Sequence, residues 1–306
     1  MSDNPEPNPD PASTSSEPPK EKKKGMSNLA VRLLTAAVGI PIILWMLFRA
    51  PSWVWSTFAL FASGIAGSEL AGMTLKGERL LQTWMVVATV AVTGVLVWTP
   101  HAEILVALLF GVFLAGPLIT LARPDPMEKA GGRMAWLIAG PLYIGGAVGA
   151  IGKLHHLNEG AGGTWVVLSM MLAWGSDTGG YFAGRAFGKH KLYEKISPKK
   201  TIEGSIGGLV TIVAMALAMH FLWMPELSVP HAITLALVAG AIGQAGDLCV
   251  SVIKRSTGVK DSGFIIPGHG GLLDRIDALM FTATVTWLYT RFVLDLPVSL
   301  PSLPLS

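Results

Sequence analysis

The feature that most constrains this chain is a series of apolar runs, each long enough to cross a membrane. A hydrocarbon core of about 30 Å needs about 20 predominantly apolar residues. The chain is 51% hydrophobic and 14% charged, with a mean hydropathy of +0.52, so it is far more apolar than an ordinary soluble domain. We therefore expect an all-α polytopic membrane protein with about nine transmembrane helices. The nine runs are Leu29–Phe48, Ser52–Met73, Leu81–Trp98, Ile104–Ala122, Met134–Gly152, Thr164–Ala183, Ser205–Met224, Ala232–Ile253 and Leu279–Leu294.

The loops between these runs predict the orientation in the membrane, because Lys and Arg accumulate in short cytoplasmic loops. Nineteen Lys and Arg residues fall on the side of the N-terminus and three on the other side, with Arg32 left uncounted inside the first run. This asymmetry predicts a cytoplasmic N-terminus and an external C-terminus. It also places the two long polar loops, after the sixth and eighth runs, on the cytoplasmic face.

Three regions are predicted along the chain. Residues 1–27 form a disordered cytoplasmic tail, because their first 25 residues are rich in Pro, Ser, Asp and Glu and have little to bury. Residues 28–160 hold the N-terminal transmembrane helices, and residues 161–306 form the C-terminal catalytic transmembrane region. Few charged or polar residues interrupt the apolar runs of residues 28–160. Glu69 is the exception, and it either extends to the interface or is paired, with no functional role required.

The first polar segment runs from Trp174 to Gly208. Asp177 lies within an apolar run, so it is expected to face the interior or a water-filled cavity and to find a cationic or metal partner. An ion pair with Arg185 is the structural alternative, although eight residues separate the two by about two helical turns. Lys199 and Lys200, before a helix N-terminus, suggest a phosphate cradle. A basic loop that contacts lipid headgroups is the alternative.

The second polar segment runs from Gly246 to Asp277. Asp247, Ser251 and Lys254 are spaced i, i+4 and i+7, so one helix face carries a carboxylate, a hydroxyl and a cation. A glycine-rich turn around His269 follows. Asp274 and Asp277 then share a face at the start of the last helix, where the helix dipole favours carboxylates.

Carboxylate oxygens, with one nearby His and a single Cys in the whole chain, suit Mg²⁺ and not zinc. Lys and Arg beside such a metal are what phosphoryl or nucleotidyl transfer requires. The structural alternative is a network of ion pairs that braces two helix ends. Nothing in the sequence suggests nucleic-acid binding.

The run S-V-I-K-R-x4-K-D-S-G-x3-P-G-H-G-G-L-L-D-R-I-D, from Ser251 to Asp277, resembles the signature of the phosphatidate cytidylyltransferase (CDP-diacylglycerol synthase) family. The runs W-G-S-D-T-x2-Y-x2-G-R-x2-G-K-H-K-L and I-S-P-K-K-T-x-E-G-x2-G-G are also similar, while the N-terminal half matches in hydropathy alone. The resemblance implies transfer of the cytidylyl group of CTP to phosphatidic acid, which gives CDP-diacylglycerol and pyrophosphate for phospholipid biosynthesis. It also implies a bacterial inner (plasma) membrane protein in contact with membrane lipids. A homodimer, and a monovalent cation beside Mg²⁺, are left open.

The resemblance places the metal-binding carboxylates on Asp247 and Asp274, and the motif serine and lysine on Ser251 and Lys254. Asp277 is added to these as a catalytic candidate that completes the metal shell or orients the lysines. The remaining candidates are assigned to substrate binding, with His269 as a loop organiser or phosphate donor and not a base. They are Asp177, Arg185, Lys199, Lys200, Arg255, Lys260, Asp261, His269 and Arg275.

Two other functions compete with this one. A CTP-dependent kinase of a polyisoprenoid alcohol would use similar phosphate chemistry but transfer the γ-phosphoryl group. An ion-coupled transporter would place charged residues near the bilayer midplane in both halves of an internal repeat. No repeat is visible in this sequence, and its polar residues gather at the cytoplasmic ends of runs in one half, which disfavours a transporter.

Overall fold

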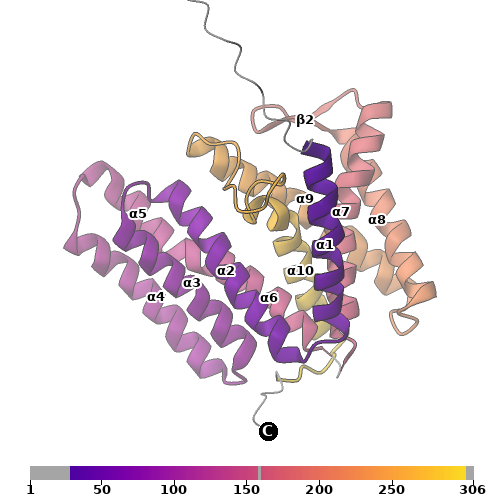
Figure 1. Cartoon of the computed structure of the whole chain (residues 1–306), viewed down its shortest axis with the longest axis horizontal. Coiled ribbons are helices and arrows are strands. Elements are labelled where there is room, and N and C mark those ends of the chain that lie inside the picture. Colours follow the sequence, from indigo (N-terminus) through magenta and orange to yellow (C-terminus); the bar gives the residue numbers. More distant parts are fainter. Residues whose placement is uncertain (1–27, 158–159, 301–306) are drawn as a thin grey trace, which may run out of the picture.

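The computed structural model describes residues 28–157 and 160–300, so the predicted tail at residues 1–27 lies outside the described residues. Apart from one small hairpin, the regular structure of the described residues is helical (Figure 1). The helices are α1 (Asn28–Phe48), α2 (Ser52–Thr74), α3 (Arg79–Trp98), α4 (Ala102–Ala122), α5 (Met127–Gly140), α6 (Gly146–His155), α7 (Gly162–Phe187), α8 (Ile202–Leu222), α9 (Val229–Ser256) and α10 (Leu273–Phe292). The strands β1 (Lys191–Tyr193) and β2 (Ser197–Thr201) pair antiparallel.

Five helical segments of the described residues are long and apolar enough to cross a membrane. They are α3, α4, the continuous stretch Met127–His155, α8 and α9. Within Met127–His155, a π-helical segment at Pro141–Gly145 joins α5 to α6. The other four predicted runs coincide with α1, α2, α7 and α10, which are not among these five segments. An integral membrane protein is therefore supported, while the number of nine spans stays a prediction.

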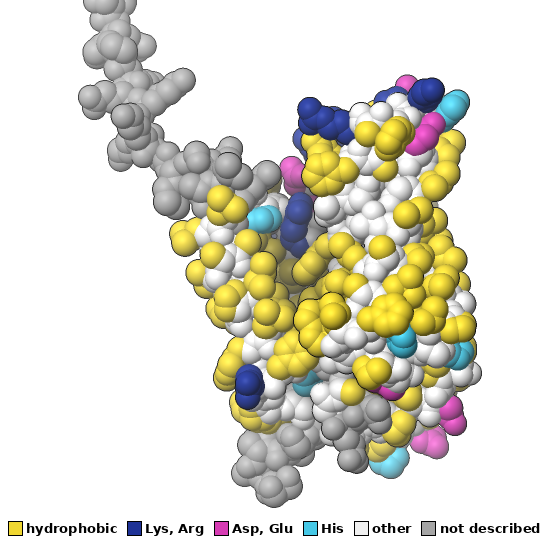
Figure 2. Space-filling view, turned by 90° about the vertical axis from the view of Figure 1, so that its right-hand side faces the viewer, with side chains coloured by type: hydrophobic (Ala, Val, Ile, Leu, Met, Phe, Trp, Pro, Cys, Tyr) yellow, Lys and Arg dark blue, Asp and Glu magenta, His cyan; other side chains and the backbone are white. Residues whose placement is uncertain are grey.

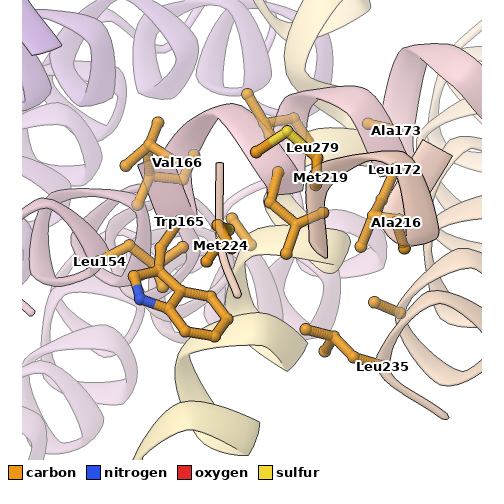
Figure 3. Packing of buried hydrophobic residues seen from close by; sticks show 14 of the residues in the cluster. Leu154, Trp165, Val166, Leu172, Ala173, Ala216, Met219, Met224, Leu235 and Leu279 are labelled. Carbon is orange, nitrogen blue, oxygen red and sulfur yellow. The ribbon is translucent and has the colours of Figure 1, made fainter. Parts of the chain in front are cut away.

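The helices form two groups that meet along α6 and α10 (Figure 1). Helices α2 to α5 lie on one side, and α7 to α9 lie on the other. Helix α1 lies with the second group, where it packs against α7, although it precedes α2 in the sequence. One buried cluster joins Trp55 of α2 to Trp165 of α7 and Leu279 of α10. Figure 3 shows Trp165 and Leu279 among the residues of this cluster. A second cluster joins Leu70 of α2 to Val250 of α9, so the packing crosses the predicted boundary at residue 160.

The outer surface of the helices is apolar, as contact with lipid requires. Phe61, Phe110, Leu118 and Val210 each expose more than 60% of their surface. Figure 2 shows hydrophobic side chains over the middle of one face and charged side chains towards its two ends. The same view shows a hollow whose upper part contains charged groups. The fold thus holds a polar region at one end of an apolar bundle.

Helices α7 and α8 approach each other closely through small residues, a packing mode common between membrane helices. A Cβ atom added to Gly207 would lie 2.1 Å from the Cβ atom of Ala183. A Cβ atom added to Gly179 would lie 2.1 Å from Thr211 Oγ1. Because this contact sets the position of the α8 N-terminus, it also sets the position of the polar residues there.

We expect Gly207→Ala to lower the free energy of unfolding by about 1–3 kcal/mol, because the added methyl group forces the helices apart. Gly111→Ala in α4 is the matched control, since a Cβ atom there meets nothing within 4 Å and Ala favours the helix by roughly 0.5–1 kcal/mol. Thermal unfolding in detergent measures both variants. Equal melting temperatures for the two variants would contradict the close α7–α8 contact.

Candidate active site

Helix α9 carries the predicted polar face at the end where it approaches the start of α10. The helix continues to Ser256, so Asp247, Ser251 and Lys254 lie along one side of its last turns. Ser251 Oγ donates a hydrogen bond of 3.4 Å to Asp247 Oδ1. Lys254 is 9% exposed although it is charged. A buried ammonium of this kind requires a partner.

Asp274 is the partner of Lys254. Lys254 Nζ donates to Asp274 Oδ1 at 2.7 Å, and the two side chains are 11% and 6% exposed. The other oxygen, Asp274 Oδ2, accepts from Ser262 N at 2.8 Å, Ser262 Oγ at 3.0 Å and Gly271 N at 3.3 Å. Asp274 lies in the first turn of α10, where the helix dipole favours a negative charge. This carboxylate therefore fixes the end of α9, the start of α10 and the intervening loop to one another.

The first polar segment contributes Lys200, which reaches α9 from strand β2. Its ammonium forms an ion pair with Asp247 and lies 3.9 Å from Asp177 Oδ1 of α7. Burial lowers the pKa of Lys200, but the carboxylates of Asp247 and Asp177 outweigh this effect and raise the pKa above its ordinary value. Lys200 is therefore charged at neutral pH. The two polar segments, which are distant in sequence, meet at this ammonium.

The hairpin that carries Lys200 is held by the first turn of α8. Thr201 Oγ1 accepts a hydrogen bond of 3.1 Å from Gly204 N and so caps α8. Glu203 accepts from the backbone N–H of Lys189 at 3.1 Å and lies 2.6 Å from His190 Nδ1. These contacts close the base of the hairpin, in which Lys191 pairs with Thr201.

Asp277 lies one turn after Asp274 on α10 and is half-buried. It is within electrostatic reach of Asp247, Lys254 and Asp177. The cluster thus contains four carboxylates and two ammonium groups from three helices and one strand. Such a density of charge is expensive in a membrane protein and is typical of functional sites.

A cavity of about 500 Å³ opens beside this cluster. Asp177, Arg185, Lys199 and Lys200 contribute charge to its lining, and α7, β2, α8 and α9 all border it. The full lining is Asp177, Gly180, Tyr181, Gly184, Arg185, Leu192, Lys199, Lys200, Thr201, Gly204, Ser205 and Gln244. Three of these residues carry cations, so the cavity suits an anionic ligand.

The sequence analysis missed Gln244 and Ser205 in this lining. Gln244 Nε2 donates to Ser176 Oγ at 2.9 Å and to the Ser205 carbonyl at 3.0 Å, while Ser205 Oγ donates to Gln244 Oε1. The sequence could have indicated Gln244, because it is a polar residue inside an apolar run. It lies three positions before Asp247, so the two side chains share one face of the helix.

The predicted residues of the second segment do not all join the cluster. Arg255, Lys260 and Asp261 are exposed, and none of them lines the cavity beside the cluster. Arg255 Nη1 donates to the Val259 carbonyl at 3.3 Å. His269 Nδ1 lies 3.3 Å from the Pro267 carbonyl, a contact within its own turn. These assignments to substrate binding stay predictions.

The alternative ion pair between Asp177 and Arg185 is not formed among the described residues. Helix α7 continues to Phe187, so the two residues stay about two turns apart. Arg185 Nη1 donates instead to Tyr181 Oη at 3.1 Å. Arg275 is exposed, yet it lies within electrostatic reach of Asp177, and its carbonyl accepts from Trp174 Nε1 at 3.3 Å.

Asp247 and Asp274 offer the kind of oxygen donor that a hard divalent cation prefers. No three His, Cys, Asp or Glu side chains of the described residues converge to hold a metal by themselves. Mg²⁺ does not need such a trio, because it binds nucleotides through one or two carboxylates and completes its shell with phosphate oxygens and water. Both carboxylates already contact a positive charge. Asp247 is paired with the ammonium group of Lys200, and Asp274 with that of Lys254.

The comparisons with known proteins agree with this chemistry. The sequence model of the cytidylyltransferase family matches residues 30–293. The phosphatidate cytidylyltransferase of Brucella suis biovar 1 (strain 1330) is 36% identical over 273 residues, which cover 86% of this chain and 94% of the relative. That of Staphylococcus haemolyticus (strain JCSC1435) is 32% identical over 262 residues, covering 83% and 95%. That of Bacillus subtilis (strain 168) is 40% identical over 142 residues, covering 46% and 52%. The chain belongs to the cytidylyltransferase family.

Proposed function

We propose that this protein is a phosphatidate cytidylyltransferase, an enzyme that transfers the cytidylyl group of CTP to phosphatidic acid and releases pyrophosphate. The observation that carries this proposal is the ion pair between Lys200 and Asp247, which lies beside the buried ion pair between Lys254 and Asp274. The ion pair between Lys200 and Asp247 joins the two polar segments into one charged cluster next to a cavity of about 500 Å³. The names of the relatives point to the same reaction.

The cavity has the charge and the backbone needed to bind a triphosphate. Arg185, Lys199 and Lys200 supply three cations, and the N-terminus of α8 supplies N–H groups and the positive end of a helix dipole. Glycine residues on both neighbouring helices, Gly180 and Gly204, line the cavity and pack closely against each other. A Cβ atom on Gly204 would lie 2.8 Å from the Gly180 carbonyl, so a larger residue would not fit there.

In the proposed reaction, an oxygen of the lipid phosphate attacks the α-phosphorus of CTP. A new P–O bond forms, the bond to the β-phosphate oxygen breaks, and the electron pair leaves with pyrophosphate. The attacking oxygen is already anionic, so no strong general base is required. Lys200 and Lys254, the two ammonium groups of the cluster, would stabilise the negative charge that develops on the phosphate oxygens.

Asp247 and Asp274 are the residues that we propose hold Mg²⁺. The three loop donors of Asp274 all contact Oδ2, while Oδ1 accepts from Lys254. One oxygen thus secures the loop, and the other faces positive charge. Asp177 and Asp277 carry carboxylates in the same cluster and would orient the lysines or complete the shell. When bound, Mg²⁺ would supply charge neutralisation for the departing pyrophosphate.

An apolar groove borders the same helix, α7, as the charged cavity and suits the acyl chains of the lipid substrate. It has a volume of about 320 Å³ and lies between α1 and α7, with Ile40 and Leu44 on one wall and Met171 on the other. Thr178 lines this groove, and its neighbour Asp177 lines the cavity. A phospholipid that placed its tails in the groove would therefore bring its headgroup towards the cluster.

The distribution of cations supports a cytoplasmic site in a bacterial inner membrane. Nineteen Lys and Arg residues fall on the side of the two polar segments and three on the other. CTP is a cytoplasmic metabolite, whereas phosphatidic acid lies in the membrane. A charged site at the cytoplasmic end of an apolar bundle would have access to both substrates.

The first test identifies which phosphate of CTP reaches the lipid. We expect membranes containing the protein to label lipid from α-labelled CTP and phosphatidic acid, and to release the γ-label as pyrophosphate, because the α-phosphorus is the proposed point of attack. Thin-layer chromatography of the lipid and aqueous fractions measures both products. Lipid labelled from the γ position, with a polyisoprenoid alcohol as acceptor, would indicate the kinase instead.

The second test removes the proposed metal carboxylates. Asp247→Asn and Asp274→Asn should each lower Mg²⁺-dependent formation of CDP-lipid to below about 1% of wild type, because neither amide binds the cation as a carboxylate does. Asp295→Asn, beyond the far end of α10, is the control and should keep full activity. Size-exclusion profiles and melting temperatures must show folded protein. Near-normal turnover in either site variant would refute that residue's assignment.

The third test concerns CTP binding in the cavity. Lys200→Met should raise the KM for CTP by about tenfold or more, since it removes the cation shared by both polar segments. Lys195→Met is the matched control, because Lys195 is exposed in the turn between β1 and β2 and does not line the cavity. Steady-state kinetics with varied CTP measures both. Equal KM values for the two variants would remove Lys200 from the binding site.

A further inference from the structure

Glu69 of α2 makes contacts that the chemistry described so far does not explain. Its Oε1 accepts a hydrogen bond of 2.9 Å from Leu272 N, and its Oε2 accepts one of 2.8 Å from Leu273 N. Ser262 Oγ donates to the same Oε2 at 2.9 Å. The first N–H groups of a helix have no partner within the helix, so they need an acceptor from elsewhere. A carboxylate from the N-terminal half of the chain fills this role for α10.

Glu69 is joined to Asp274 through one shared hydroxyl group. Ser262 Oγ lies 2.9 Å from Glu69 Oε2 and 3.0 Å from Asp274 Oδ2. Because a hydroxyl group carries a single proton, the two carboxylates share it. The position of Glu69 thus affects the oxygen through which Asp274 is fixed, while the other oxygen of Asp274 faces Lys254.

The glycine residues of the loop fit closely around Glu69. A Cβ atom on Gly263 would lie 2.7 Å from Glu69 Oε1, and one on Gly271 would lie 2.1 Å from Ser262 Oγ and 2.8 Å from Glu69 Oε2. Any larger residue at either position would push the carboxylate away from the loop. The absence of a side chain at both positions is therefore what lets the loop close around Glu69.

Two further contacts from the N-terminal half reach the same loop. Lys76 Nζ, just after α2, donates to the Thr257 carbonyl at 2.6 Å. Thr35 Oγ1 of α1 donates to the Pro267 carbonyl at 3.3 Å. The loop is thus contacted near its start, in its glycine-rich turn and at its end by elements that carry none of the proposed catalytic groups.

We propose that Glu69 is a positioning residue for cytidylyl transfer: it caps α10 and, through Ser262, holds Asp274 in the orientation that the reaction requires. This inference rests on the proposed function of the cluster. It assigns the N-terminal helices a part in catalysis in addition to their place in the membrane. It also makes the catalytic constant, more than CTP binding, depend on Glu69, because the cavity lining comes from α7, β1, β2, α8 and α9 and includes no residue of α2.

The kinetic test uses Glu69→Gln, which keeps the size of the side chain but replaces one acceptor oxygen with a donor. We expect kcat to fall by about tenfold to a hundredfold, because a small displacement of a reacting group has effects of this size. The KM for CTP should stay within about threefold of wild type, since the cavity is untouched. Glu103→Gln, in the first turn of α4, is the matched control and should leave both constants unchanged.

A double variant tests the shared hydroxyl group. Ser262→Ala should lower kcat as well, and Glu69→Gln combined with Ser262→Ala should be less harmful than the product of the two single effects, because both substitutions break one link. Multiplicative effects would show that Glu69 and Ser262 act independently, which would overturn the coupling to Asp274.

Hydrogen exchange tests the positioning role without relying on activity. In Glu69→Gln, peptides covering residues 262–274 should exchange about tenfold faster, because one of the two backbone N–H groups that bond to Glu69 loses its acceptor oxygen. Peptides from α8 should exchange at the wild-type rate. Unchanged exchange in the loop, or a wild-type kcat, would overturn the proposal, and faster exchange throughout the protein would show a general structural role instead.

If the wild-type protein made no CDP-lipid, the proposed function would fail, while the exchange data would still show whether Glu69 holds the loop.

Discussion

The ion pair between Lys254 and Asp274 is the interaction on which the polar end of the structure depends. Moving either charge out of water costs several kcal/mol, and the attraction between them offsets this cost only when the remaining oxygens and protons are also satisfied. Asp274 meets this requirement, because Oδ2 accepts from Ser262 N, Ser262 Oγ and Gly271 N while Oδ1 accepts from Lys254. The loop between α9 and α10 therefore has to close in one conformation, and that conformation places Asp247 and Asp277 beside the same pair.

The apolar bundle makes this arrangement possible by keeping the charges at one end. Its outer residues face lipid, where an unpaired charge or an unsatisfied backbone group is costly. Buried clusters run across both halves of the chain and hold α9 and α10 against α2. The N-terminal helices carry no recognisable catalytic motif, yet Glu69 and Lys76 from that half hydrogen-bond to the loop. The two halves act together at the site.

Much of the fold follows from local sequence patterns, whereas the contacts of the site do not. Apolar runs located the helices, because length and hydropathy are local properties, and the spacing of Asp247, Ser251 and Lys254 predicted their common face for the same reason. The interaction of Lys200 with Asp247 depends on the hairpin of β1 and β2, which the sequence analysis treated as a loop. Glu69 could not be assigned, because a carboxylate at the end of an apolar run has the same local pattern whether it faces water or caps a helix 200 residues later.

A high density of charged residues in a motif does not by itself locate a site. The charged residues of this motif differ in burial, and buried and exposed residues can have different roles. Lys254 and Asp274 are almost fully buried, so their geometry is fixed before any substrate arrives. Lys199 and Arg185 are exposed in the cavity lining, so they keep the freedom to adjust to an anionic ligand. Arg255 and Lys260 are exposed outside that lining. A fixed buried pair beside adjustable cations is the arrangement that phosphate-transfer chemistry favours, since reacting groups must be held in place while the leaving pyrophosphate must be able to depart.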